Sequence, residues 1–87
     1  MRITKLEIVP IKPNQGLVGF ANIILEDQIF LGSIGIHLKL NGDGYRLSYP
    51  TRKIGDQSIT IFHPVTPQLS RIIEEAIEAQ INKLLQV

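Results

Sequence analysis

Short runs of alternating apolar and polar residues occupy the first two-thirds of the chain, and turn-forming residues separate them. Alternation with a period of two is typical of β-strands that bury one face. The polar segment 50–56 is predicted to be a loop. The pattern predicts about five strands, at residues 4–9, 17–25 and 28–40, from Tyr45 onward, and at residues 57–63.

Two turns determine the expected pairing of the central strands. Glu26 and Asp27 predict a two-residue hairpin turn, and the run Asn41-Gly42-Asp43-Gly44 predicts a tighter one, because Asn-Gly and Asp-Gly readily adopt positive φ. The expected register matches apolar residues with apolar ones and polar residues with polar ones. It places Leu40 opposite Tyr45, Lys39 opposite Arg46, Leu38 opposite Leu47, and His37 opposite Ser48.

The C-terminal segment has a different period. Apolar residues recur about every 3.6 positions from Leu69 to Leu85, which is typical of an amphipathic helix. Thr66 is the expected N-cap and Pro67 the first helical residue. The polar positions include an acidic stripe that is expected to face solvent, namely Glu74, Glu75 and Glu78.

Strands followed by one amphipathic helix predict an α+β fold. We expect a single domain, residues 1–87, with an antiparallel β-sheet of about five strands over residues 2–63. A C-terminal amphipathic helix over about residues 67–85 is expected to cover one face of this sheet. On the third strand, the residues expected to face the helix are Phe30, Ile34, Ile36, Leu38 and Leu40.

The second face of the sheet has no helix to cover it. A two-residue turn at 26–27 places an apolar patch there, and a patch of this kind requires a partner. We expect a homodimer interface, because a domain this short buries only about 60–65% of its unfolded surface and gains stability from association. The alternative is that a loop or the end of the helix covers the patch. Its members are Phe20, Ile24, Ile29 and Leu31.

The other end of the same face carries the residues expected to bind nucleic acid. Lys39 and Arg46 are expected to face one another across two strands, an arrangement that is destabilising unless an anion lies between them. Arg52 and Lys53, in the following loop, are expected nearby. Four cations at one end of a sheet form a patch suited to phosphate. The alternative is a solvated polar surface.

The overall charge is nearly neutral, with nine Lys and Arg against eight Asp and Glu. Segment 67–87 holds two basic and three acidic residues, so the rest of the chain has a net charge of +2 and is the expected place for an anion site. No apolar run is long enough for a signal peptide or a membrane span, and no cysteine is present. We therefore expect a soluble, cytoplasmic protein with no membrane partner.

Residues suited to catalysis or metal binding are sparse. The two histidines, His37 and His63, have no carboxylate or further histidine at a metal-binding spacing, and His63 is expected to anchor the strand-to-helix junction by a hydrogen bond. No serine stands in a nucleophile motif, and no glycine-rich loop precedes the helix. We expect no enzymatic activity, no metal, no cofactor and no small-molecule substrate.

Several short motifs, taken in order, resemble those of the stage V sporulation protein G family of septation regulators. Each motif is short, but their common order covers nearly the whole chain. The resemblance implies a dimer in which a β-sheet is followed by a C-terminal helix, and site-selective binding to DNA or RNA. The motifs are Arg2-Ile3-Thr4, Gly16, Ala21, Ile24-Leu25-Glu26-Asp27, Asn41-Gly42-Asp43-Gly44, Pro50-Thr51-Arg52-Lys53 and Phe62-His63-Pro64.

The resemblance also implies particular contact residues. Arg52 and Lys53 take the positions of the family's basic residues after the proline. Ile59 departs from the family pattern, because an arginine is typical at this position. The expected function is therefore a nucleic-acid-binding regulator with one cation fewer than is typical of the family. The alternative is a protein–protein interaction module without nucleic-acid binding, in which the apolar patch contacts a different protein.

Overall fold

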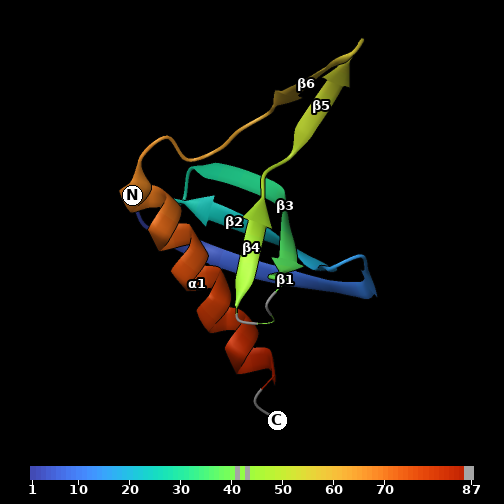
Figure 1. Ribbon diagram of the computed structural model, residues 1–87. Coiled ribbons are helices and arrows are strands. Elements are labelled where there is room, and N and C mark those ends of the chain that lie inside the picture. Colours follow the sequence, from blue (N-terminus) through green and yellow to red (C-terminus); the bar gives the residue numbers. More distant parts are fainter. Residues whose placement is uncertain (41, 43, 86–87) are drawn as a thin grey trace.

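The computed structural model describes residues 1–40, 42 and 44–85, with the side chain of residue 85 excepted. The fold is α+β, as predicted: a four-stranded antiparallel sheet in the order β1-β2-β3-β4, a two-stranded sheet β5-β6, and one helix (Figure 1). Asn41 and Asp43 of the predicted 41–44 turn lie outside the described residues. The elements are β1 (Ile3–Asn14), β2 (Leu17–Leu25), β3 (Ile29–Leu38), β4 (Tyr45–Ser48), β5 (Thr51–Ile54), β6 (Gln57–Thr60) and α1 (Pro67–Leu85).

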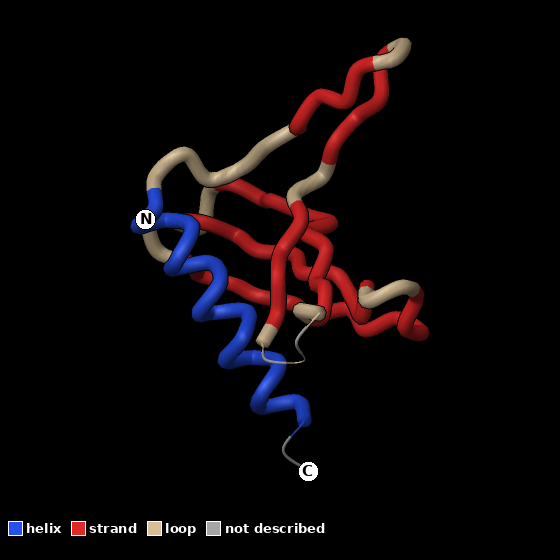
Figure 2. Tube along the Cα trace, in the orientation of Figure 1, coloured by secondary structure: helices blue, strands red, loops and turns tan. Residues whose placement is uncertain are grey.

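The helix lies along one face of the four-stranded sheet, and the two-stranded sheet projects away from both (Figure 2). We call the four-stranded sheet and α1 the body, and residues 51–60 the arm. The core lies between α1 and the sheet and is aliphatic, as the alternating strands and the 3.6-residue period require. Its buried residues are Ala21, Ile23, Leu25, Ile34, Ile36, Ile73, Ile77 and Ile81.

The helix begins where the sequence predicts. Pro67 is its first residue, and the side-chain Oγ1 of Thr66 accepts a hydrogen bond from the backbone N–H of Leu69 at 3.2 Å. This bond satisfies one of the backbone donors left free at a helix N-terminus. Thr66 is therefore the N-cap, as predicted. No helix of the described chain is long and apolar enough to cross a membrane.

The first strand is longer than predicted. β1 runs from Ile3 to Asn14, although Pro10 was expected to end it at residue 9. Pro10 is tolerated because β1 is an edge strand, where a missing backbone N–H leaves no neighbouring strand unpaired.

The turn between β2 and β3 is one residue longer than predicted. Glu26 and Asp27 have φ of 52° and 56°, the Gln28 N–H donates to the Leu25 carbonyl at 2.9 Å, and Leu25 pairs with Ile29. Because a shift of one residue turns side chains to the opposite face, the faces predicted for three residues were wrong. Ile29 and Leu31 lie on the helix side, and Phe30 lies on the other face.

A bulge at Ser33 restores the predicted alternation. Ser33 has φ of 63°, and its N–H donates to Oδ1 of Asn22 at 2.9 Å. The register between β2 and β3 shifts at this point, so that Ile34 and Ile36 face the helix and are buried, as predicted.

The β3–β4 register differs from the predicted one by two residues. Leu38 pairs with Tyr45 and His37 with Arg46, so Lys39 does not lie opposite Arg46. The loop is longer than expected, and the Lys39 N–H donates to the Gly44 carbonyl at 3.2 Å. Leu38 lies on the helix side, as predicted, where it lines a pocket with Tyr45 and Ile81, although it is 46% exposed. The prediction for Leu40 was wrong, since its side chain is fully exposed.

The predicted loop at 50–56 was also wrong. Residues 51–54 form β5, which pairs with β6 across a two-residue turn, Gly55-Asp56. Gly55 has φ of 61°, a conformation that glycine adopts without steric cost. The arm is a separate sheet rather than a fifth strand of the main sheet, and every residue in it is exposed.

Candidate nucleic-acid interface

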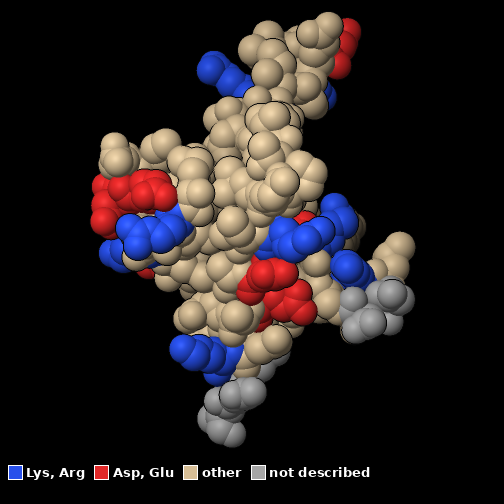
Figure 3. All heavy atoms as spheres, turned by 90° about the vertical axis from the view of Figure 1, so that its left-hand side faces the viewer, with Lys and Arg blue, Asp and Glu red and all other residues tan. Residues whose placement is uncertain are grey.

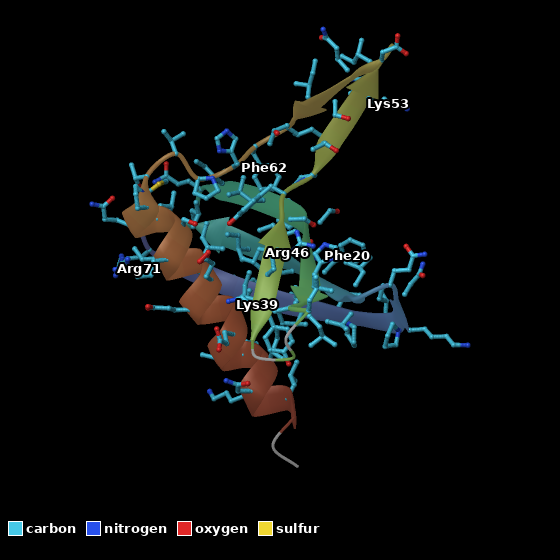
Figure 4. The ribbon with its side chains drawn as sticks, viewed as in Figure 1. Phe20, Lys39, Arg46, Lys53, Phe62 and Arg71 are labelled. Atoms are coloured by element: carbon cyan, nitrogen blue, oxygen red, sulfur yellow. The ribbon has the colours of Figure 1, made fainter. Side chains whose placement is uncertain are left out.

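The four predicted cations lie in two separate groups. Lys39 and Arg46 lie on the body, near α1, whereas Lys53 lies out on the projecting arm (Figure 4). Arg52, the neighbour of Lys53 in β5, is on the arm as well. The single four-cation patch predicted from the sequence is therefore wrong, because the arm leaves the body instead of folding back beside β4.

The two cations on the body lie in a groove that also contains carboxylates. Lys39 and Arg46 line a groove of about 230 Å³ together with Glu74 and Glu78 of α1. Figure 3 shows basic and acidic side chains side by side midway along this surface. Carboxylates so close to the two cations compete with phosphate for them, so this groove is poorly suited to a polyanion.

The arm cations point to opposite faces of the ribbon. Arg52 pairs directly with Ile59, and Lys53 pairs with Ser58. Because paired residues share a face and neighbours alternate, Arg52 lies on an apolar face with Ile54 and Ile59, and Lys53 lies on a polar face. Asp56, in the turn, is the one acidic residue of the arm. In Figure 3 the basic side chains of the arm stand well apart from the acidic groups of the body.

Two aromatic residues pack against each other where the arm joins the body. Tyr49 and Phe62 flank the arm and pack edge to face, with ring centroids 6.0 Å apart and an interplanar angle of 74°. The Ile61 N–H donates to the Pro50 carbonyl at 2.9 Å and joins the two chain segments at this point. Burial, followed by the charge of Glu74, raises the pKa of Tyr49 to about 12. The hydroxyl of Tyr49 is buried with no hydrogen-bond partner among the described residues.

The face of the main sheet opposite α1, which we call the open face, has a mixed surface. Phe20 lies on the side of the sheet away from the helix (Figure 4), and its partner Gly35 lies between it and Ser48. Two of the four residues predicted for a dimer interface, Phe20 and Ile24, lie on this face. The pairings place the following residues there: Lys5, Glu7, Val9, Leu17, Phe20, Asn22, Ile24, Phe30, Gly35, His37, Arg46 and Ser48.

Phe30 is the feature of the open face that sequence reasoning missed. Its side chain is 67% exposed, and it pairs with Ile24. The two-residue turn expected at 26–27 assigned it to the core. The available signal was the absence of glycine from that turn, which weakens the case for a two-residue loop.

The two histidines have local hydrogen-bond partners. His37 Nε2 lies 2.8 Å from Ser48 Oγ, across the β3–β4 pair. His63 Nδ1 lies 3.1 Å from the Pro64 carbonyl oxygen, a local hydrogen bond at the strand-to-helix junction, as predicted. No group of three His, Asp or Glu side chains within the described part of the chain is placed to hold a metal ion.

No protein-family model matches this chain. A comparison with curated protein sequences finds no match either.

Proposed function

We propose that this protein is a nucleic-acid-binding regulator rather than an enzyme, and that the arm makes its principal contacts to DNA or RNA. One observation carries the proposal: a two-stranded ribbon projects from the body, fully exposed, with a cation on each face. The major groove of duplex DNA admits a two-stranded β-ribbon, and basic side chains on such a ribbon reach the flanking phosphates.

The charge around the arm supports the same assignment. Arg52 and Lys53 are exposed and lie away from the acidic stripe of α1, whereas Lys39 and Arg46 share a groove with Glu74. Phosphate binding releases condensed counterions, so the affinity falls with salt by a log–log slope of about −0.9 for each phosphate neutralised. The arm cations are therefore expected to dominate the salt dependence.

The motif order supports this function independently. The run Pro50-Thr51-Arg52-Lys53 and the run Phe62-His63-Pro64 resemble the stage V sporulation protein G family, in which nucleic-acid binding is the described activity. Both runs flank or form the arm. Ile59 replaces the arginine typical of that family and pairs with Arg52, so the apolar face of the arm carries one cation instead of two.

Fluorescence anisotropy of labelled duplex DNA and RNA, titrated with protein over a range of salt concentrations, tests the proposal. The Arg52→Ala/Lys53→Ala variant is expected to bind at least about tenfold more weakly at low salt and to reduce the salt slope by about 2. The matched control, Lys12→Ala/Lys83→Ala, removes the same charge from exposed positions off the arm and is expected to change the affinity much less. Equal losses in both variants, or no binding by the unaltered protein at low salt, would refute the assignment.

A second candidate function, protein–protein interaction, is supported by the apolar face of the arm. Ile54, Ile59 and Ile61 are 54%, 47% and 61% exposed. An isolated two-stranded hairpin is marginally stable in water, and it gains stability when its apolar face packs against another surface. We propose that this surface belongs to a second copy of the chain, so that the homodimer forms through the arm and not through the predicted patch.

A further inference from the structure

We propose that the open face binds single-stranded nucleic acid by stacking bases on Phe20 and Phe30. This inference goes beyond the proposed function, because it concerns a surface separate from the arm and a single-stranded ligand instead of a duplex. The two rings lie on the two central strands of a four-stranded antiparallel sheet whose opposite face is covered by a helix. In one class of RNA-binding domain, aromatic residues on a four-stranded sheet stack two or three bases.

Phe30 is placed to act as a stacking platform. Its ring lies over Gly32, where an added Cβ would come within 2.7 Å of the ring. The ring therefore lies against the backbone of β3, in the space that glycine leaves free at position 32. The side chain of Phe30 is 67% exposed. An exposed ring of this kind is a surface on which a base can stack.

Phe20 supplies a second ring at a fixed spacing. It lies four residues from Ile24, the partner of Phe30, so the two ring-bearing positions are separated by about 13 Å along β2. Asn22 lies between them, with its amide donating to Glu7 Oε1 at 3.0 Å and accepting from the Ser33 N–H. This network holds the surface between the rings in one arrangement.

Polar and basic groups border the rings on both sides. Arg46 and His37 lie next to one another at the β4 edge, and Ser48 is hydrogen-bonded to His37. Lys5 lies at the β1 edge, in the row of Ile24 and Phe30. A strand whose bases stack on the rings places its phosphates near these edge groups. Lys5 complements their charge, whereas Arg46 also lines the groove that holds Glu74 and Glu78.

A single strand fits this face better than a duplex or a second protein copy does. Bases within a duplex are stacked on one another, and a flat sheet face cannot reach their rings. Glu7 lies on the edge strand β1, where its carboxylate accepts a hydrogen bond from Asn22. The apolar face of the arm provides a separate surface for a second copy.

The test compares binding of a fluorescein-labelled oligouridylate and a labelled duplex by anisotropy. Phe30→Leu keeps an apolar side chain but removes the ring, and it is expected to weaken single-strand binding between about fivefold and about a hundredfold. Phe30→Trp restores the ring and is expected to restore binding. The control Ile24→Val alters an apolar residue of the same face that has no ring, and it is expected to leave the affinity within about twofold.

Two further readouts separate stacking from other roles. The salt slope is expected to stay unchanged in Phe30→Leu, because the phosphate contacts remain. Oligonucleotides that carry 2-aminopurine are expected to lose fluorescence on binding to the unaltered protein and to lose less on binding to Phe30→Leu. Circular dichroism and thermal unfolding establish that each variant is folded.

Several outcomes overturn the inference. Equal effects of Phe30→Leu and Ile24→Val, or equal loss of duplex and single-strand binding in Phe30→Leu, exclude stacking. If Phe30→Leu separates a dimer into monomers in sedimentation, the occupant of the open face is a second copy. If Arg52→Ala/Lys53→Ala abolishes binding while Phe30→Leu has no effect, the proposed function stands and the stacking site fails. Binding to neither polymer refutes both.

Discussion

Tyr49 combines a well-packed ring with an unsatisfied hydroxyl. The ring packs against the core and edge to face against Phe62, but the buried oxygen has no hydrogen-bond partner among the described residues. A buried hydroxyl without a partner loses its hydrogen bonds to water with no compensation. The aromatic ring therefore stabilises the junction between arm and body, whereas the hydroxyl does not.

Tyr49→Phe is expected to leave the free energy of unfolding at neutral pH unchanged, or to raise it by up to about 1 kcal/mol, because only the unsatisfied hydroxyl is removed. Urea denaturation followed by circular dichroism measures this difference. Tyr49→Leu serves as the control, since it also removes the ring packed on Phe62 and should destabilise the protein. A clear loss of stability in Tyr49→Phe would show that the hydroxyl has a partner in solution.

The pKa of Tyr49 also predicts a pH dependence. Burial raises the folded-state pKa to about 12 from an ordinary value of 10.0, so between these values the unfolded chain loses the proton and the folded chain keeps it. The free energy of unfolding therefore falls as the pH rises through this window. Tyr49→Phe should show a shallower fall from pH 10 to pH 12, and equal slopes would contradict the assignment.

At the scale of elements, the bulge in β3 determines which residues occupy the open face. Ser33 adopts φ of 63°, which is unfavourable for a residue with a Cβ, and the Asn22 side chain accepts its N–H. The longer β2–β3 turn moves Phe30 to the open face, and the bulge returns Ile34 and Ile36 to the core. The turn and the bulge together produce a buried core and an exposed aromatic ring on one strand.

Asn22→Ala is expected to destabilise the protein by about 1–2 kcal/mol, because the Ser33 N–H loses its acceptor in a strained conformation. The Ser33 amide should exchange with solvent faster in this variant, as measured by NMR hydrogen exchange. Glu7→Gln is the matched control. It replaces the carboxylate that accepts from the Asn22 amide by a neutral group and leaves the hydrogen bond between Asn22 and Ser33 in place. Unchanged exchange at Ser33 in Asn22→Ala would mean that water or another group holds the bulge.

At the scale of the whole molecule, the arm gives the chain an extended outline of 44 × 32 × 22 Å. Its apolar face carries Ile54 and Ile59, and Ile61 continues the same alternation where the arm joins the body. A symmetric dimer through this face would bury the three isoleucines reciprocally and stabilise the ribbon. Lys53 would remain on the exposed polar face, free to contact phosphate. Arg52 shares the apolar face, so this dimer is an alternative to phosphate binding by Arg52.

Ile54→Thr/Ile59→Thr is expected to weaken self-association by at least about tenfold, because it removes apolar contacts but keeps β-branched side chains that favour strands. Sedimentation velocity over a range of concentrations measures the association. Thr51→Ser/Thr60→Ser, on the polar face, is the control and should associate like the unaltered protein. A monomer at every concentration, or equal association of both variants, would refute an arm-mediated dimer.

The candidate site shows where prediction from the sequence was limited. The predicted open-face residues Phe20 and Arg46 do lie there, because the alternation within β2 and β4 is local. Lys39 and Arg46 were expected to be opposite each other, but the 39–44 loop is longer than a tight turn. Arg52 and Lys53 were expected beside them, but β5 pairs with β6 and not with β4.

The sequence by itself determined the α+β class, the capped helix at Pro67–Leu85 and the aliphatic core, because these depend on periodicity and on local capping. Only the tertiary structure decided the strand registers, the separation of the arm and the position of Phe30. Registers depend on turn lengths, and here the turns and the bulge use positive φ at Glu26, Asp27 and Ser33, residues that ordinarily avoid it. One residue more or less in a turn reverses the faces of the residues that follow until a bulge compensates, as it does at Ser33. A correct strand pattern therefore led to a wrong prediction of which residues are exposed.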